Sequence, residues 1–159
     1  MNTLKLILVT LLGLASLCAA AESSPQAVVE ALHENLLGTM REAEQLGFDG
    51  RQQRVRPVIE ASFDFPTIAR IVTGRAWKTV SAEQQNHFIE VFRALSSATY
   101  ASNFSGYNGE KFHTDSVEEN RGSQIVRTFL VKPDGEKISL NYMLRENNGN
   151  WKIVNVIAQ

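Results

Sequence analysis

The sequence has only one cysteine, Cys18, among its 159 residues. One thiol cannot form an intramolecular disulfide, and without a second cysteine nearby it cannot build a cysteine-based metal site. A large excess of either charge is also lacking, because 16 lysines and arginines face 17 aspartates and glutamates. With a formal charge of −1 and no long basic run, the field of the whole protein is too weak to attract nucleic acid or an acidic membrane surface unless charge is locally concentrated.

Motifs of catalysis and cofactor binding are lacking as well. His33, His87 and His113 lie in three different expected elements, and none of them has the spacing of a metal site. There is no G-x-S-x-G, G-x-G-x-x-G or Walker sequence. Adjacent acids such as Glu118 and Glu119 point to opposite faces of a strand or lie in a turn, so they cannot act together on one substrate. We therefore expect no enzyme activity, no cofactor and no metal.

Two polar features leave alternatives open. Asp64 is the one acid embedded in an apolar motif, where helix capping is the commoner role and catalysis is the alternative. Arg51, Arg54 and Arg56 form a small basic cluster that could meet a phosphate head group. Arginines near the start of a helix are more often a solvated face.

The first 21 residues differ from the rest of the chain. A lysine near the start is followed by an apolar run from Leu6 to Leu17 and then by three alanines. The run is shorter than the ~20 apolar residues that span a bilayer, so the pattern predicts a cleaved signal peptide over residues 1–21. Lipidation at Cys18 is a lesser alternative, because a bulky leucine precedes it. We expect an exported protein with a single domain over residues 22–159.

The first part of the mature chain has apolar residues at helical spacing. This spacing predicts helices over about 25–44, 52–61, 66–73 and 82–104. Ser81 and Gln84 fit the capping box that opens the last of these helices. Its wide apolar face is predicted to contain Phe88, Phe92, Leu95 and Thr99, with Ile89, Val91 and Ala98 beside them.

From about residue 111 to residue 158 the apolar pattern alternates with a period of two. Turn residues at 133–135 and 146–150 separate the alternating segments. We expect four antiparallel strands in meander order, over about 112–117, 124–132, 138–145 and 151–157. Helices followed by a curved sheet give an α+β fold.

Several motifs follow one another in a fixed order. FDFPTIARIVTGRAW precedes the SAEQQ opening of the long helix, which continues through FIEVFR to TYASNF. Together they resemble the MlaC and toluene-tolerance family of periplasmic lipid-binding proteins, over about residues 25–158. The later segments YNGEKF, VRTFLVKPDGEKISLNYMLR and WKIVNV resemble the branch associated with hopanoid biosynthesis, often called HpnM.

The resemblance implies an NTF2-like sheet joined to helices around an apolar pocket, with lipid tails inside and the head group near solvent. It also implies traffic of phospholipid or hopanoid between an outer-membrane lipoprotein complex and an inner-membrane ABC transporter. We expect a monomer without a nucleic-acid partner. Members of the family usually continue past the WKIVNV-type strand into C-terminal helices. We therefore expect either that this sequence is a fragment or that the protein lacks an element that helps cover the pocket.

Apolar side chains are plentiful enough for either a filled core or a cavity between the helices and the sheet. A carrier needs an apolar lining and no catalytic group. The candidates lie on the apolar face of the long helix, near its end, or at strand positions expected to point inward: Phe92, Leu95, Tyr100, Phe129, Leu140, Tyr142 and Leu144. Each could equally be plain core. The alternative function is a periplasmic adaptor that has a filled core and binds a protein partner.

Overall fold

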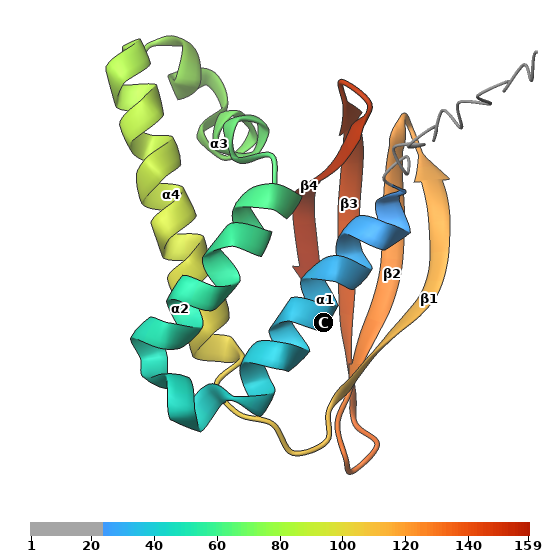
Figure 1. Cartoon of the computed structure of the whole chain (residues 1–159). Helices are drawn as coiled ribbons and strands as arrows, with labels where there is room; N and C mark the ends of the chain where they lie inside the picture. Colours follow the sequence, from blue (N-terminus) through green and yellow to red (C-terminus); the bar gives the residue numbers. More distant parts are fainter. Residues whose placement is uncertain (1–23) are drawn as a thin grey trace, which may run out of the picture.

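Four α-helices precede a four-stranded antiparallel sheet in the computed structural model, which describes residues 24–159 (Figure 1). The helices are α1 (Pro25–Arg41), α2 (Ala43–Ser62), α3 (Phe65–Thr73) and α4 (Ala82–Asn103), and the short 3-10 helix η1 (Gly74–Lys78) follows α3. The strands are β1 (Lys111–Asn120), β2 (Ser123–Val131), β3 (Lys137–Asn147) and β4 (Asn150–Ala158). The predicted α+β fold is confirmed. The predicted signal peptide lies outside the described residues.

Local capping signals set the starts of three helices. The Ser24 side chain caps α1 by accepting a hydrogen bond from a backbone N–H of the first turn. Ser81 and Gln84 form the predicted capping box at the start of α4. Asp64 caps α3, because its carboxylate accepts a hydrogen bond of 2.9 Å from the Thr67 N–H. The commoner of the two roles considered for Asp64 is therefore the one observed.

The predicted break between the first two helices is a kink rather than a loop. α1 ends at Arg41 and α2 begins at Ala43, so helical turns occupy residues that were expected to form a loop. Within α2, Gly47 has φ of 60° and ψ of −174°. Glycine reaches positive φ without steric cost, and this one residue redirects the chain.

The strands pair in the order β1-β2-β3-β4, as the alternating pattern predicted. β4 contains one extra residue, Val154, because Leu144 pairs with Ile153 whereas Met143 pairs with Asn155. A bulge of this kind bends the strand. It also allows the consecutive residues Ile153 and Val154 both to be buried.

The core lies between the helices and one face of the sheet. In Figure 1, α1 crosses that face while α2 and α4 lie side by side next to it. The largest fully buried side chains of the core are Val29, Leu32, Leu36, Val55, Ile59, Phe65, Val126, Tyr142, Leu144 and Ile153. The Asp64 N–H donates to the Ile153 carbonyl oxygen at 3.0 Å, so the start of α3 is fixed to β4.

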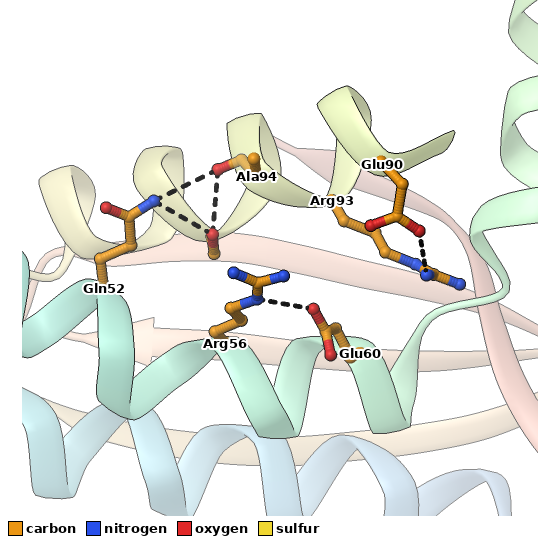
Figure 2. Close-up of polar contacts among 7 residues, drawn as sticks. Gln52, Arg56, Glu60, Glu90, Arg93 and Ala94 are labelled. Atoms are coloured by element: carbon orange, nitrogen blue, oxygen red, sulfur yellow. Dashed lines mark hydrogen bonds and ion pairs between the residues drawn. The ribbon is translucent and has the colours of Figure 1, made fainter. Parts of the chain in front are cut away.

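Polar contacts join α2 to α4 (Figure 2). The Gln52 amide lies 3.4 Å from the Ser97 hydroxyl and 3.5 Å from the Ala94 carbonyl oxygen. Two ion pairs of 2.7 Å accompany this contact, each within a single helix: Arg56–Glu60 and Glu90–Arg93. The charges of this surface are therefore balanced locally.

Candidate functional site

A cleft of about 300 Å³ lies between α3, α4 and β4. This volume is at the lower end of the ~300–1,000 Å³ typical of small-molecule pockets. α3 and α4 each contribute residues three or four positions apart, which lie on one face of a helix. The cleft is lined by Phe63, Phe65, Ile68, Val72, Phe92, Ser96, Tyr100, Val154, Asn155 and Val156.

Four aromatic rings form the base of the cleft. The Phe63 ring lies 5.9 Å from Phe65 and 6.0 Å from Tyr100, and Phe65 meets Phe92 edge to face at 5.8 Å, measured between ring centroids. These separations are within the range of favourable aromatic pairs. The base of the cleft is therefore a contiguous apolar surface.

Tyr100 brings one polar atom to this apolar surface. Burial raises the pKa of Tyr100, so its hydroxyl stays protonated and can donate a hydrogen bond. With Ser96 and Asn155, Tyr100 supplies the few polar groups of the lining.

The two helices that line the cleft also carry exposed apolar side chains. Ile71 is 55% exposed and Val72, which lines the cleft, is 65% exposed. On α4, Val91 and Leu95 are more than half exposed. Val72 therefore leaves apolar surface in water at the cleft itself.

A second, wider groove of about 780 Å³ lies between η1 and the first half of α4. Trp77 and Phe88 meet edge to face in its wall at 6.4 Å, and Phe88 stacks on Phe92 of the cleft at 6.0 Å. One row of aromatic rings therefore runs from the groove to the cleft. Glu83 and His87 are the titratable residues in the groove wall.

Five of the seven predicted lining residues lie either in the lining of the cleft or in the core. Phe92 and Tyr100 line the cleft. Leu140, Tyr142 and Leu144 lie on the inner face of the sheet, where they pack into the core. The structure therefore brings two of the seven to a cavity and places three in the filled interior.

The predicted orientation of Leu95 is wrong, because its side chain is 58% exposed. The buried positions of α4 include Ile89, Ser97 and Ala101. Small side chains let α4 approach α2 closely, so the buried face turns away from Leu95. The predicted apolar face included Leu95 but left out Ser97 and Ala101, whose small side chains are buried.

The predicted inward position of Phe129 is also wrong. Phe129 pairs with Ser139, whereas Thr128 pairs with Leu140. Directly paired residues share a sheet face, so Phe129 lies on the face opposite Leu140. There the Lys137 ammonium lies 5.7 Å from the centre of its ring.

Most of the cleft was not predicted from the sequence. The spacing of Phe65, Ile68 and Val72 in the third helix carries the signal for one wall. Val154 and Val156 enter the cleft because of the β4 bulge, and alternation alone cannot locate a bulge.

The arginine cluster considered as a head-group site is dispersed. Arg51 donates to the carbonyl oxygens of Ala43 and Ala101 and so joins three helical segments. Arg54 and Arg56 pair with different glutamates. These contacts assign the arginines to structural roles.

Residues 24–159 were also compared with the requirements of a metal site and of a membrane-spanning helix, and they meet neither. No group of three or more histidine, cysteine, aspartate or glutamate side chains there could hold a metal ion. Within the same residues, no helix is both long and apolar enough to cross a membrane.

The family model described as MlaC protein matches residues 30–159. The chain belongs to the MlaC family. This confirms the family resemblance found in the sequence, while the hopanoid-associated branch stays a prediction.

Two known proteins are similar to this MlaC-family chain. The intermembrane phospholipid transport system binding protein MlaC of Haemophilus influenzae is 27% identical over 92 residues. That match covers 55% of this chain and 43% of the relative, which is less than half of the relative's length. A phospholipid-binding protein from Ralstonia solanacearum, solved in complex with a phospholipid, has a TM-score of 0.74 and 22% identity. The similarity covers 84% of this chain and 77% of the Ralstonia solanacearum chain. It shows that the two proteins share a fold.

Proposed function

We propose that this protein is a periplasmic lipid carrier that holds the acyl tails of a phospholipid in the cleft between α3, α4 and β4. The observation that carries the proposal is the row of aromatic rings in the cleft, with the exposed side chain of Val72 in the same lining. Family membership and the names of the two relatives support it.

The energetics explain why a carrier is needed. A lipid with ~30 tail methylenes faces a cost of about 24 kcal/mol to enter water, at ~0.8 kcal/mol for each methylene. A soluble protein lowers this cost by covering the tails with apolar side chains. Such a role needs no acid, base or nucleophile, and the cleft lining contains no acidic, basic or histidine side chain.

The volume of the cleft implies that α3 moves when tails enter. A cavity of about 300 Å³ is small for a molecule with two long chains. Only Phe65 and Ala69 of α3 are buried, and Gly74 follows the helix with φ of 56°. We infer that α3 remains attached to β4 at Asp64 and swings outward, which widens the cleft.

Phe92 and Tyr100 are the residues we assign to direct contact with lipid. The Tyr100 hydroxyl can donate a hydrogen bond to an ester carbonyl of the lipid, because it lines the cleft and burial keeps it protonated. Leu140, Tyr142 and Leu144 form the packed layer beneath the aromatic base, and Leu95 lies outside it. Phe129 has no place in this site.

Export by a signal peptide over residues 1–21 is part of the same proposal. The expected route runs between an outer-membrane lipoprotein complex and an inner-membrane transporter, and the relative's name supports an intermembrane role. A phospholipid is favoured as cargo by the names of both relatives, and a hopanoid is the alternative. The tightly filled interior around Tyr142 and Leu144 favours a second candidate, an adaptor that binds protein and carries no lipid.

Native mass spectrometry of the protein exported from cells tests this proposal. We expect one phospholipid per protein, identified after solvent extraction. Ser96→Asp should abolish lipid loading, because it places a charge in the cleft. Ser102→Asp is the matched control, since Ser102 is exposed on the same helix outside the cleft, and it should retain lipid. A wild-type protein that stays empty after incubation with phospholipid vesicles would favour the adaptor.

A further inference from the structure

The part of the chain that contains α3 and η1 is basic. From Phe65 to Ala82 the chain contains Arg70, Arg75 and Lys78 and no acidic residue. All three are exposed, and none of them forms an ion pair with any residue in the described range 24–159. The nearest contact is a hydrogen bond of 3.3 Å from Arg70 to the Thr67 hydroxyl. These cations are therefore available to bind an anionic partner.

Apolar side chains accompany the cations. Ile71 and Val72 directly follow Arg70 and are among the most exposed large apolar residues of the described chain. Trp77 lies between Arg75 and Lys78, half-buried in the wall of the wider groove. We call residues 70–78 the tip.

The tip occupies one end of the molecule. In Figure 1, α3 and η1 lie at the start of α4, and the turn between α1 and α2 lies at the other end. α4 has 22 residues, so these two ends are about 33 Å apart. Three acids lie near the tip: Glu83 is exposed in the groove wall, Asp64 caps α3, and Glu90 is paired with Arg93.

We propose that the tip docks on the surface of an anionic lipid bilayer. Exposed aliphatic side chains flanked by arginine, lysine and a tryptophan match the water–lipid boundary, where apolar groups insert between head groups and cations meet phosphates. Ile71 and Val72 are the inserted residues, and Arg70, Arg75 and Lys78 contact the phosphates. Because Val72 also lines the cleft, docking places the cleft mouth against the bilayer. This interaction goes beyond the proposed cargo site and stands whether or not the cleft holds lipid.

Flotation with vesicles tests the docking surface. The purified protein is mixed with phosphatidylcholine vesicles that contain either no phosphatidylglycerol or about one-third phosphatidylglycerol. We expect binding to the anionic vesicles that weakens as salt is raised, because screening shortens the range of the attraction. Equal binding to both kinds of vesicle, or no binding to either, would overturn the proposal.

Paired charge variants locate the site. Arg75→Gln with Lys78→Gln should weaken binding to anionic vesicles about 25-fold, at about fivefold for each cation. Lys111→Gln with Lys137→Gln removes the same charge where β1 and β3 begin, away from the tip, and should change binding less than twofold. Equal losses in both variants would mean that net charge, and not the tip, is responsible.

Apolar variants test insertion. Ile71→Ser with Val72→Ser should reduce binding at least tenfold, whereas Phe48→Ser, which removes an exposed ring near the α1–α2 end, should have little effect. Lipid loading is measured by native mass spectrometry on the Arg75→Gln and Lys78→Gln variant, because neither residue lines the cleft. Loss of flotation with cargo retained separates failure of docking from failure of the cleft.

Discussion

At the scale of single residues, the most consequential buried group is His33. Its ring is 4% exposed, stacks on Phe112 at 3.8 Å between centroids, and places Nε2 3.0 Å from the Tyr142 hydroxyl. Burial lowers the pKa of His33 from 6.5 to about 4. The folded protein therefore holds this imidazole neutral where the unfolded chain would protonate it.

This pKa difference predicts a pH-dependent stability. Between pH 6.5 and 4 the unfolded chain binds a proton at His33 that the folded protein does not, so the free energy of unfolding falls as the pH falls through this window. The contribution is fully present above pH 6.5. From pH 6.5 to 5 the expected loss is about 2 kcal/mol, at 1.36 kcal/mol for each pH unit.

Urea unfolding at several pH values between 7.5 and 5 measures this loss. His33→Gln should flatten the pH dependence, although it lowers the overall stability by disturbing the contact with Tyr142. His87→Gln is the control, because His87 is exposed, and it should keep the wild-type slope. A wild-type slope that His33→Gln leaves unchanged would contradict the assignment.

At the scale of elements, the connection from α3 to η1 depends on one glycine. Gly74 ends α3 with φ of 56° and ψ of −124°, a conformation that residues with a Cβ rarely adopt. No atom lies within 4 Å of the position a Cβ would occupy, so the cost of a side chain here comes from the backbone alone. The direction in which α3 leads into η1 is therefore set by this residue.

Gly74→Ala is expected to lower the free energy of unfolding by about 1–3 kcal/mol, the usual cost of a strained backbone position. Gly106→Ala is the matched control, since Gly106 also has open space around it but has no positive φ, and it should leave stability nearly unchanged. Chemical denaturation of the two variants measures the difference. Equal effects at both positions would mean that Gly74 is not strained.

Most elements could be predicted because their signals are local. The capping box of α4 involves residues three positions apart, and the strands follow from alternation, so both were predicted correctly. The orientation of Leu95 and the sheet face of Phe129 depend on tertiary contacts: how closely α4 approaches α2, and which residue of β3 pairs with β2. Spacing along one element does not contain that information.

At the scale of the whole molecule, the cleft arises from three elements distant in sequence. The start of α3 is joined to β4 by the hydrogen bond from Asp64 to Ile153, and α4 packs alongside. The bulge at Val154 turns the edge strand toward the same space. The sequence predicted an apolar layer between helices and sheet, but how much of that layer is cavity depends on packing that only the assembled structure defines.

The cleft and the tip are adjacent in the assembled molecule. Val72 belongs to both, because it lines the cleft and is exposed within residues 70–78. A carrier with this arrangement meets the bilayer at the same end where tails enter. The distance a tail travels through water is then short.

Photo-crosslinking with a phospholipid that carries a diazirine in one acyl tail tests the central claim most directly. After loading and irradiation, mass spectrometry of the digested protein locates the attached lipid. We predict attachment within three stretches that line the cleft. They are residues 63–72, which include most of α3, residues 92–100 of α4, and residues 154–156 of β4. Attachment confined to the opposite sheet face, at Phe129 or Ile157, would contradict the proposed cleft.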